Sequence, residues 1–217
     1  MMRLKSLRED PFRSMAHSIG RVQKRILPAL WLALLTLASA RHARAQETVL
    51  ELDPAQTQIG FTLGDVLHTV HGLFKLKQGT ISFNPATGQA GGLVVVDATS
   101  GDSGSHARDH KMHKDVLQSD QFPEITFVPQ QVQGQVLPAG DFKVQVMGIF
   151  TMHGESHPLT LSVQANTTGE QLTANVTFDV PYVNWGLKNP STLFLRVNSV
   201  VGITIQAVGH IRLVTAH

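Results

Sequence analysis

The sequence predicts a single, nearly all-β domain built as an antiparallel sandwich or barrel. Short runs rich in β-branched and aromatic residues recur along the chain, and Gly, Pro, Asn or Asp bounds each of them. Apolar and polar residues alternate within several of these runs, as in residues 142–146 (FKVQV). No linker, low-complexity tract or internal repeat divides the chain after residue 45.

The positions of these runs, and of the turns between them, predict the individual strands. Asp53-Pro54 and residues 84–88 (NPATG) have the composition of turns, and Gly79 marks a candidate β-bulge. The strands are predicted at residues 49–52, 58–63, 73–83, 93–96, 125–128, 142–146 with a continuation through 149–152, 159–163, 172–180 and 194–207.

Residues 105–119 lack the alternation of a strand and are predicted to form one short surface helix against the sheet. Met112, Val116 and Leu117 lie at helical offsets within this segment. Ser105 is expected to cap its amino end, and Asp109 to lie in an early turn, where the helix dipole favours a negative charge.

Residues 1–45 have the features of a cleaved secretory signal peptide. Arg21, Lys24 and Arg25 precede the uncharged apolar run 26–40, and alanines in A-x-A spacing follow. This run is shorter than the roughly 20 residues that cross a bilayer, so a membrane anchor is the weaker interpretation. We expect cleavage after Ala45 rather than Ala40, which leaves residues 46–217 as one domain with no stable membrane span.

Removal of this leader changes the charge of the chain. Nine of the 18 Lys and Arg residues lie in 1–45, but only two of the 16 Asp and Glu residues do, so residues 46–217 carry a formal charge of −5 with His neutral. The remaining cations form no stripe that matches a phosphate backbone, and we expect no nucleic-acid partner. The chain has no cysteine, which excludes disulfides, thiolate metal sites and a Cys nucleophile.

Several short motifs follow one another in order along residues 48–214. They are Leu52-Asp53-Pro54, residues 59–63, His71-Gly72-Leu73-Phe74, residues 79–83, Arg108-Asp109, Leu117, residues 122–127 (FPEITF), residues 148–154 (GIFTMHG), residues 182–186 (YVNWG) and a closing hydrophobic strand to Ile205. No single motif is decisive, but the ordered set resembles the YceI-like family of exported lipid-binding proteins.

The resemblance implies an eight-stranded, antiparallel, lipocalin-like β-barrel that holds a long isoprenoid chain in its lumen. A barrel of about eight strands has an interior wide enough for side chains or for one slender ligand. Inward alternation predicts lumen positions at Phe61, Phe74, Phe83, Phe127, Phe142, Val144, Val146, Phe178 and Trp185, with Tyr182 and Asn184 as polar contacts for a head group. For each apolar residue, packing in an ordinary core is the simpler alternative.

Histidines offer a sharper chemical hypothesis, a metal site. Three sets have suggestive spacing: His106, His110 and His113, which share one face of a helix; His68 and His71; and His153 and His157. No HExxH motif is present, and Asp109 and Asp115 fall on other sides of the helix. We therefore favour solvated polar surfaces, and expect no metal and no cofactor other than a bound isoprenoid lipid.

Two further motifs are better explained by structure than by catalysis. Residues 101–104 (GDSG) match the nucleophile segment of chymotrypsin-like proteases, but the rest of that pattern is missing. Arg108 and Asp109 are expected to tie the helix to the barrel rim, and loss of this lid-like helix to open the lumen.

The sequence thus predicts a non-catalytic, exported protein, periplasmic or secreted, that carries or sequesters a polyisoprenoid-type lipid. Two alternatives stay open. One is a periplasmic protein that acts on or delivers a prenylated quinone with help from a His or metal site. The other is a stress or interaction module whose barrel is filled by its own side chains. A homodimer formed through an exposed edge or rim is a further option.

Overall fold

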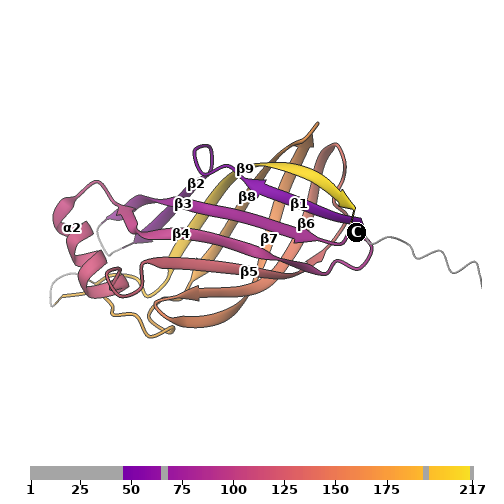
Figure 1. Cartoon of the computed structure of the whole chain (residues 1–217). Helices are drawn as coiled ribbons and strands as arrows, with labels where there is room; N and C mark the ends of the chain where they lie inside the picture. Colours follow the sequence, from indigo (N-terminus) through magenta and orange to yellow (C-terminus); the bar gives the residue numbers. More distant parts are fainter. Residues whose placement is uncertain (1–45, 65–67, 193–195, 216–217) are drawn as a thin grey trace, which may run out of the picture. The chain divides into compact units, whose positions relative to one another are not determined.

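The computed structural model describes residues 46–64, 68–192 and 196–215, and these form nine β-strands and one short helical segment (Figure 1). The strands are β1 (Gln46–Leu52), β2 (Gln58–Gly64), β3 (Thr69–Phe83), β4 (Ala90–Asp102), β5 (Glu124–Gln133), β6 (Gly140–Met152), β7 (Glu155–Thr168), β8 (Gln171–Val180) and β9 (Val201–Thr215). A strand lies at each predicted position. The proposed leader, residues 1–45, lies outside the described residues.

The last strand was predicted at residues 194–207, and its start was wrong. Residues 194 and 195 lie outside the described part, and residues 196–200 precede β9 without belonging to a strand. The Ser191 hydroxyl accepts a hydrogen bond from the backbone N–H of Val197 at 2.8 Å. Polar side chains therefore satisfy backbone groups here that a strand would give to its neighbour.

Hydrogen bonds between antiparallel neighbours close the strands into a barrel. Strands β3 to β9 follow one another around it in sequence order, and β1 and β2 both pair with β9 on one side and β3 on the other. β1 and β2 lie end to end and together occupy one strand position, between β9 and β3. The nine strands of the described chain therefore fill eight positions around the barrel. The predicted eight-stranded antiparallel barrel is confirmed.

A turn at residues 53–57 separates β1 from β2 and is attached to β9 at Val208. The backbone N–H of Asp53 donates to the carbonyl oxygen of Val208 at 2.8 Å. The Thr57 hydroxyl donates to the same oxygen at 3.3 Å and accepts from the N–H of Val208 at 3.2 Å. These bonds replace the ladder where the strand is interrupted, so the barrel wall continues across the turn.

Strands β6 and β7 form a regular hairpin, paired from Gly140 and Thr167 to Met152 and Glu155. Its two-residue turn is His153-Gly154, with φ of 54° and 79°. Positive φ at both positions is the requirement of a type I′ turn, whose twist suits a hairpin. The His153 ring packs against Phe122, with ring centroids 4.5 Å apart.

The helix predicted at residues 105–119 is present, but it is α-helical only in α2 (His106–Lys111) and continues as a π-helical turn in η2 (Met112–Leu117). A π-turn places residues five apart on one face, so Met112 and Leu117 face the same way. The expected side-chain cap by Ser105 was wrong: its hydroxyl makes no capping bond, and its carbonyl oxygen instead accepts from the N–H of Asp109. Within the described part of the chain, no helix is long and apolar enough to cross a membrane.

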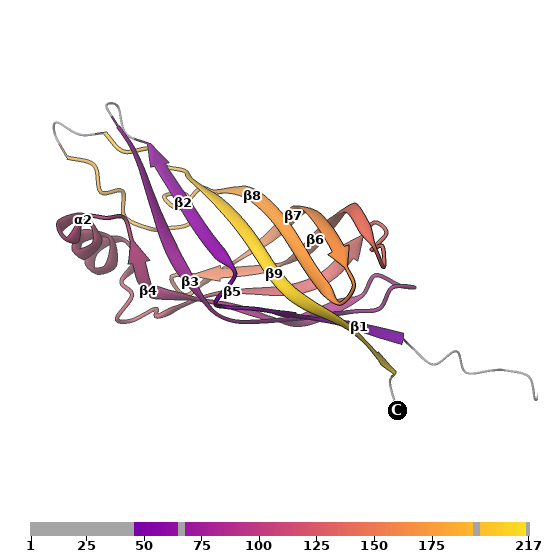
Figure 2. The same cartoon turned by 90° about the horizontal axis from the view of Figure 1, so that it is seen from above.

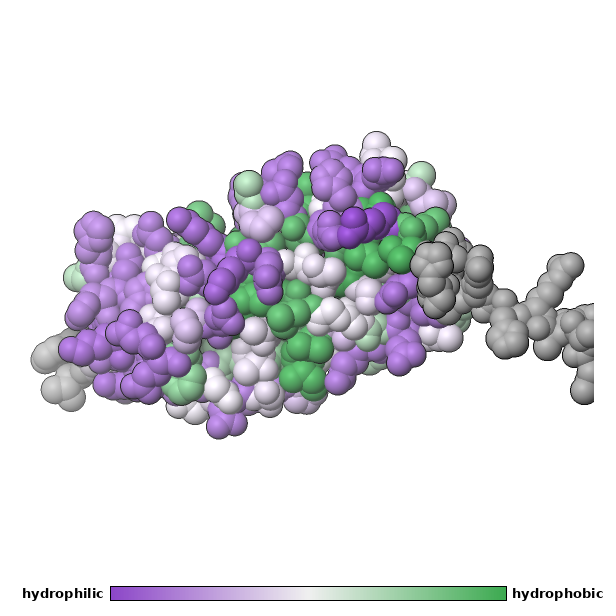
Figure 3. Space-filling view, viewed as in Figure 1, coloured by the Kyte–Doolittle hydropathy of each residue, from purple (hydrophilic) through white to green (hydrophobic). Residues whose placement is uncertain are grey.

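The helix lies at one end of the barrel, together with the described part of the β8–β9 connection, and we call this the helix end (Figures 1 and 2). At the opposite, far end, β1 begins beside the last residues of β9, since Gln46 is the partner of Thr215. The face seen in Figure 3 is hydrophilic over the helix end, and apolar residues gather further along the barrel.

The Val208 attachment predicts a stability effect at Thr57, which is 7% exposed. Thr57→Val keeps the shape of the side chain but removes the hydroxyl that accepts from the partly buried N–H of Val208. We expect the free energy of unfolding to fall by about 1–2 kcal/mol, measured by urea denaturation.

Thr62→Val is the matched control, because Thr62 lies on β2 and its hydroxyl contacts His71 in an exposed position. It should change stability by less than about 0.5 kcal/mol. Equal losses in the two variants would contradict the role of Thr57.

Candidate functional site

The lumen of the barrel holds two adjacent cavities. The helix-end cavity has a volume of about 520 Å³, and the far-end cavity of about 170 Å³. Six apolar residues line both of them, so the two spaces are adjacent and share part of their wall: Ile59, Val96, Ile125, Phe150, Phe178 and Ile205. The larger volume lies within the usual range of ligand-binding cavities.

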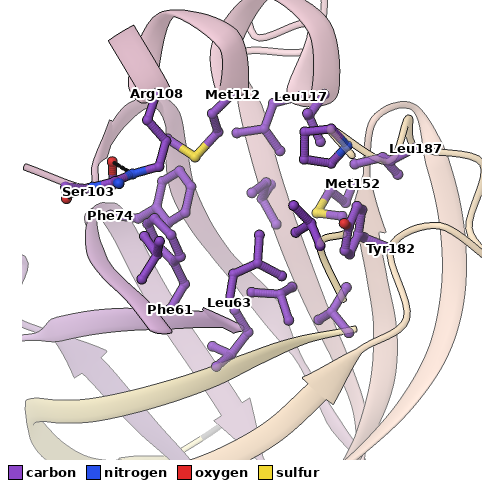
Figure 4. Close-up of a pocket in the computed structure, with 18 of the residues that line it drawn as sticks. Phe61, Leu63, Phe74, Ser103, Arg108, Met112, Leu117, Met152, Tyr182 and Leu187 are labelled. Carbon is purple, nitrogen blue, oxygen red and sulfur yellow. Dashed lines mark hydrogen bonds between the residues drawn. The ribbon is translucent and has the colours of Figure 1, made fainter. Parts of the chain in front are cut away.

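The helical segment forms one side of the helix-end cavity. Its contribution comes from Ala107, Arg108, Lys111, Met112, Val116 and Leu117. Figure 4 shows Met112 and Leu117 directed from the helix toward the side chains of Phe61 and Phe74, which come from β2 and β3. The two phenyl rings are in contact, with centroids 5.3 Å apart. The helix therefore covers an apolar space rather than resting on a filled core.

The far-end cavity is almost wholly apolar. Its polar side chains are those of Thr57 and Thr126, and Thr57 already bonds to Val208. Three of the lining residues, on three different strands, are alanines: Ala165, Ala174 and Ala207. Their short side chains leave room in a cavity whose other lining residues are mostly Leu, Ile, Val and Phe.

Eight of the nine apolar residues predicted to line the lumen do line a cavity, and so does Tyr182, which was predicted as a polar contact. Phe61, Phe74 and Tyr182 lie at the helix-end cavity, Phe178 at both, and Phe83, Phe127, Phe142, Val144 and Val146 at the far-end cavity. Their contact with a ligand stays a prediction. For the eight of these residues that lie on strands, inward alternation therefore placed the side chains on the lumen side.

Trp185 was wrongly placed, because it lines neither cavity. It lies in the turn after β8, where the alternation of a strand no longer applies. Its ring stacks on His157 of β7, with centroids 4.0 Å apart and planes 7° from parallel. It also approaches Phe150, at 5.7 Å between centroids.

The proposed polar contacts at residues 182 and 184 differ in position. Tyr182 is 4% exposed, its hydroxyl donates to the carbonyl oxygen of Asn198 at 2.7 Å, and burial raises the pKa of that hydroxyl. Asn184 is exposed and lines neither cavity. The hydroxyl of Tyr182 thus holds the β8–β9 connection in place. The side chain of the same residue lines the helix-end cavity.

Arg108 and Asp109 hold the helix to the end of β4 through one residue, Ser103. Arg108 donates from Nε to the Ser103 hydroxyl and from Nη2 to its carbonyl oxygen, each at 2.7 Å. Asp109 Oδ1 accepts from the N–H of Ser103 at 2.9 Å and from its hydroxyl. The expected tie between helix and barrel rim is present, and among described residues the Ser103 hydroxyl has no histidine partner.

The Asp109 carboxyl has a pKa below its ordinary value. Burial of the carboxyl raises the pKa, but the hydrogen bonds from the Ser103 side chain and backbone, with the charges of Arg108 and His113, outweigh that effect. The charged form is therefore the one that the folded protein stabilises, and the attachment of the helix is strongest when Asp109 is ionised.

The histidine sets do not assemble into a ligand cluster in the described residues, where no group of three His, Asp or Glu side chains is placed to hold a metal. His106 and His110 are exposed. His113 turns toward the barrel, with Nε2 at 2.9 Å from the carbonyl oxygen of Gly101 and Nδ1 at 3.2 Å from the Ser119 hydroxyl. No histidine lines either cavity.

The sequence analysis missed some of the lining residues. Met152 and Leu187 line the helix-end cavity, as do the cations Arg108 and Lys111. The spacing of Met112, Val116 and Leu117 was the available signal for the helix face. Nothing in the sequence indicated that Arg108 and Lys111 reach the same space.

Comparison with known proteins gives one family. The model of the YceI-like domain matches residues 50–209. A UPF0312 protein of Pseudomonas savastanoi pv. phaseolicola is 31% identical over 150 residues, which cover 68% of this chain and 76% of that protein. A UPF0312 protein of Vibrio vulnificus is 30% identical over 139 residues, or 63% of this chain and 71% of that protein.

Two solved structures share the fold. BcnA of Burkholderia cenocepacia has a TM-score of 0.61 and 18% identity, and the match covers 72% of this chain and 98% of BcnA. A domain of Saccharophagus degradans described as polyisoprenoid-binding has a TM-score of 0.55 and 11% identity, and the match covers 75% of this chain and 98% of that one.

The Ser103 contacts predict that Asp109→Ala loosens the helix from the barrel. Loss of bonds to an ionised acceptor at a partly exposed position should cost about 1 kcal/mol, so amide exchange in residues 103–117 should become roughly fivefold faster at pH 7. Hydrogen-exchange mass spectrometry measures this directly.

The difference in amide exchange rate between the wild-type protein and Asp109→Ala should be large at neutral pH and shrink in acid. Because the folded pKa of Asp109 is depressed, its contribution is complete above the unfolded value of about 3.9 and is lost as the pH falls through the folded value. Asp120→Ala, at an exposed carboxylate, is the control. A rate difference that persists unchanged at pH 3 would contradict the assignment.

Proposed function

The chain belongs to the YceI-like family, and on that premise we propose that it is a non-catalytic protein that holds a long apolar chain of polyisoprenoid type in its barrel lumen. The observation that carries this proposal is the pair of adjacent cavities, lined almost entirely by apolar side chains. The solved Saccharophagus degradans domain, described as polyisoprenoid-binding, supports the choice of ligand class.

The physical chemistry of the lumen favours a slender hydrocarbon chain. Each methylene moved from water into such a space contributes roughly 0.8 kcal/mol, so a chain that reaches from the helix-end cavity into the far-end cavity gains with every added carbon. The shape of the lumen and the length of the chain then decide selectivity, and few polar contacts are needed.

The two alternatives from the sequence are less well supported. A barrel filled by its own side chains would leave no cavities of this volume. An enzyme acting on a prenylated quinone needs reactive groups near the ligand, and none of the described residues that line the two cavities is a histidine or a carboxylate. The proposed site of action, the periplasm or the cell exterior, rests on the leader-like features of residues 1–45.

Purification from the native compartment tests the proposal. Native mass spectrometry should show an added mass that organic solvent removes, and the released molecules should differ by whole isoprene units. A protein that carries no lipid and takes up none from added prenyl chains would overturn the proposal, and a chemically altered lipid would favour the enzyme.

The alanines of the far-end cavity predict a change in chain-length preference. Ala174→Leu should fill part of this cavity and exclude the end of a long chain, at a cost of about fourfold in affinity for each methylene displaced. Affinity for a chain short enough to stay in the helix-end cavity should be unchanged. Titration with prenyl alcohols of increasing length measures both.

Thr173→Leu is the matched control, since Thr173 is the exposed neighbour of Ala174 on β8. Loss of affinity for long and short chains alike in Ala174→Leu would show that the far-end cavity does not hold the end of the chain.

A further inference from the structure

The polar side chains that line the lumen are concentrated at one end and include two cations. Besides the two threonines of the far-end cavity, they are Ser103, Ser105, Arg108, Lys111 and Tyr182, all at the helix-end cavity. Within the described lining residues there is no carboxylate, side-chain amide or imidazole. The lumen therefore has an apolar end and a positively charged end.

The hydroxyl groups at the charged end are mostly engaged. The Ser103 hydroxyl accepts from Arg108 and donates to Asp109, and the Tyr182 hydroxyl donates to Asn198. Lys111 donates one hydrogen bond, to the carbonyl oxygen of Pro190 at 2.9 Å, and an ammonium group has three N–H groups. Arg108 bonds to Ser103 through Nε and Nη2, which leaves the N–H groups of Nη1. The donors left for a ligand are thus mainly on positive charges.

Of the two cations, Lys111 has less negative charge nearby to balance its own charge. Asp109 balances Arg108 in part, because both contact Ser103. Among described residues, Lys111 forms no ion pair, and its bonded partner is the neutral carbonyl of Pro190. Arg108 and Lys111 are three residues apart on α2 and so lie on one face of the helix.

We propose that the ligand is an amphiphile with an anionic head group, a phosphate or a carboxylate, held by Lys111 and Arg108 at the helix end, with its tail directed to the far end. This inference rests on the proposed function and adds the charge of the head group and the direction of the chain. Anionic oxygens accept hydrogen bonds and neutralise both cations at once.

Neutral head groups match this site less well. An alcohol brings a donor of its own, and the lining offers few free acceptors. A quinone accepts hydrogen bonds but brings no charge to balance Lys111, whose bonded partner is a neutral carbonyl. The charge of the head group is therefore the property that the site selects.

Three probes with the same geranylgeranyl tail separate these cases: the phosphate, the free alcohol and a naphthoquinone that carries the tail. Their affinities are measured by displacement of the neutral apolar fluorophore N-phenyl-1-naphthylamine from the protein. We expect the phosphate to bind about tenfold more tightly than the other two, and this advantage to shrink as the salt concentration rises.

Lys111→Met keeps the length of the side chain and removes the charge, and it should abolish most of the preference for the phosphate. Lys111→Arg should retain the preference. Lys114→Met is the matched control, because Lys114 is exposed on η2 and lines neither cavity. Thermal unfolding of each variant verifies that the barrel is intact.

The outcomes are distinct. Equal affinities for the three probes would overturn the inference and leave the proposed function standing. A preference for the phosphate that survives in Lys111→Met would overturn the assignment of the head-group site. Binding of none of the three by the intact protein would overturn the proposed function and this inference together.

Discussion

Closure of the barrel by β9 is the constraint on which the interior of this protein depends. β9 pairs with β8 on one side, and with β1 and β2 in succession on the other. Without the second set of pairs the sheet would have two open edges, and the apolar inward faces of its strands would meet water. The bonds from Asp53 and Thr57 to Val208 carry this seam across the break between β1 and β2. The cavities exist because the wall is continuous there.

The wall of the helix-end cavity is held together by two kinds of hydrogen bond. The strands of the wall are joined by backbone ladders. The helix is attached by side chains, above all by Arg108 and Asp109 to Ser103 and by His113 to Gly101. A part held by a few partly exposed hydrogen bonds opens at lower cost than a strand within a ladder. The helix is therefore expected to open more readily than the strands of the wall, and it lies over the larger cavity.

Much of this architecture could be predicted from the sequence, because apolar and polar residues alternate along a strand and the apolar ones face inward. Phe142, Val144 and Val146 are examples, each separated by a polar residue that faces outward. The same rule failed at Trp185, which follows the end of β8, where side-chain direction depends on a turn. It also gave no account of Lys111, because a cation on a short helix ordinarily faces solvent. Its approach to the cavity depends on how the helix docks, which is a tertiary property.

The change from α2 to η2 shows a similar limit. Hydrophobic spacing located the helical segment, but the sequence pattern does not distinguish Met112 and Leu117 on a π-turn from the same residues on an α-helix. Likewise, Asp109 could be assigned to the start of a helix, yet its partner proved to be Ser103 rather than the helix dipole alone. Ser103 follows the end of β4 and meets Asp109 only through the way the helix docks on the barrel.

The pairing of Gln46 with Thr215 places the first and the last residue that the structure describes side by side, at the end of the barrel away from the helix. A short peptide could join them there, and new termini could be opened in a surface turn such as residues 84–88 without cutting the helix or its attachment to β4. Circular permutation of this kind would leave the ring of strands unchanged. For the same reason, a surface attached at residue 46 or residue 215 would leave the helix end facing solution.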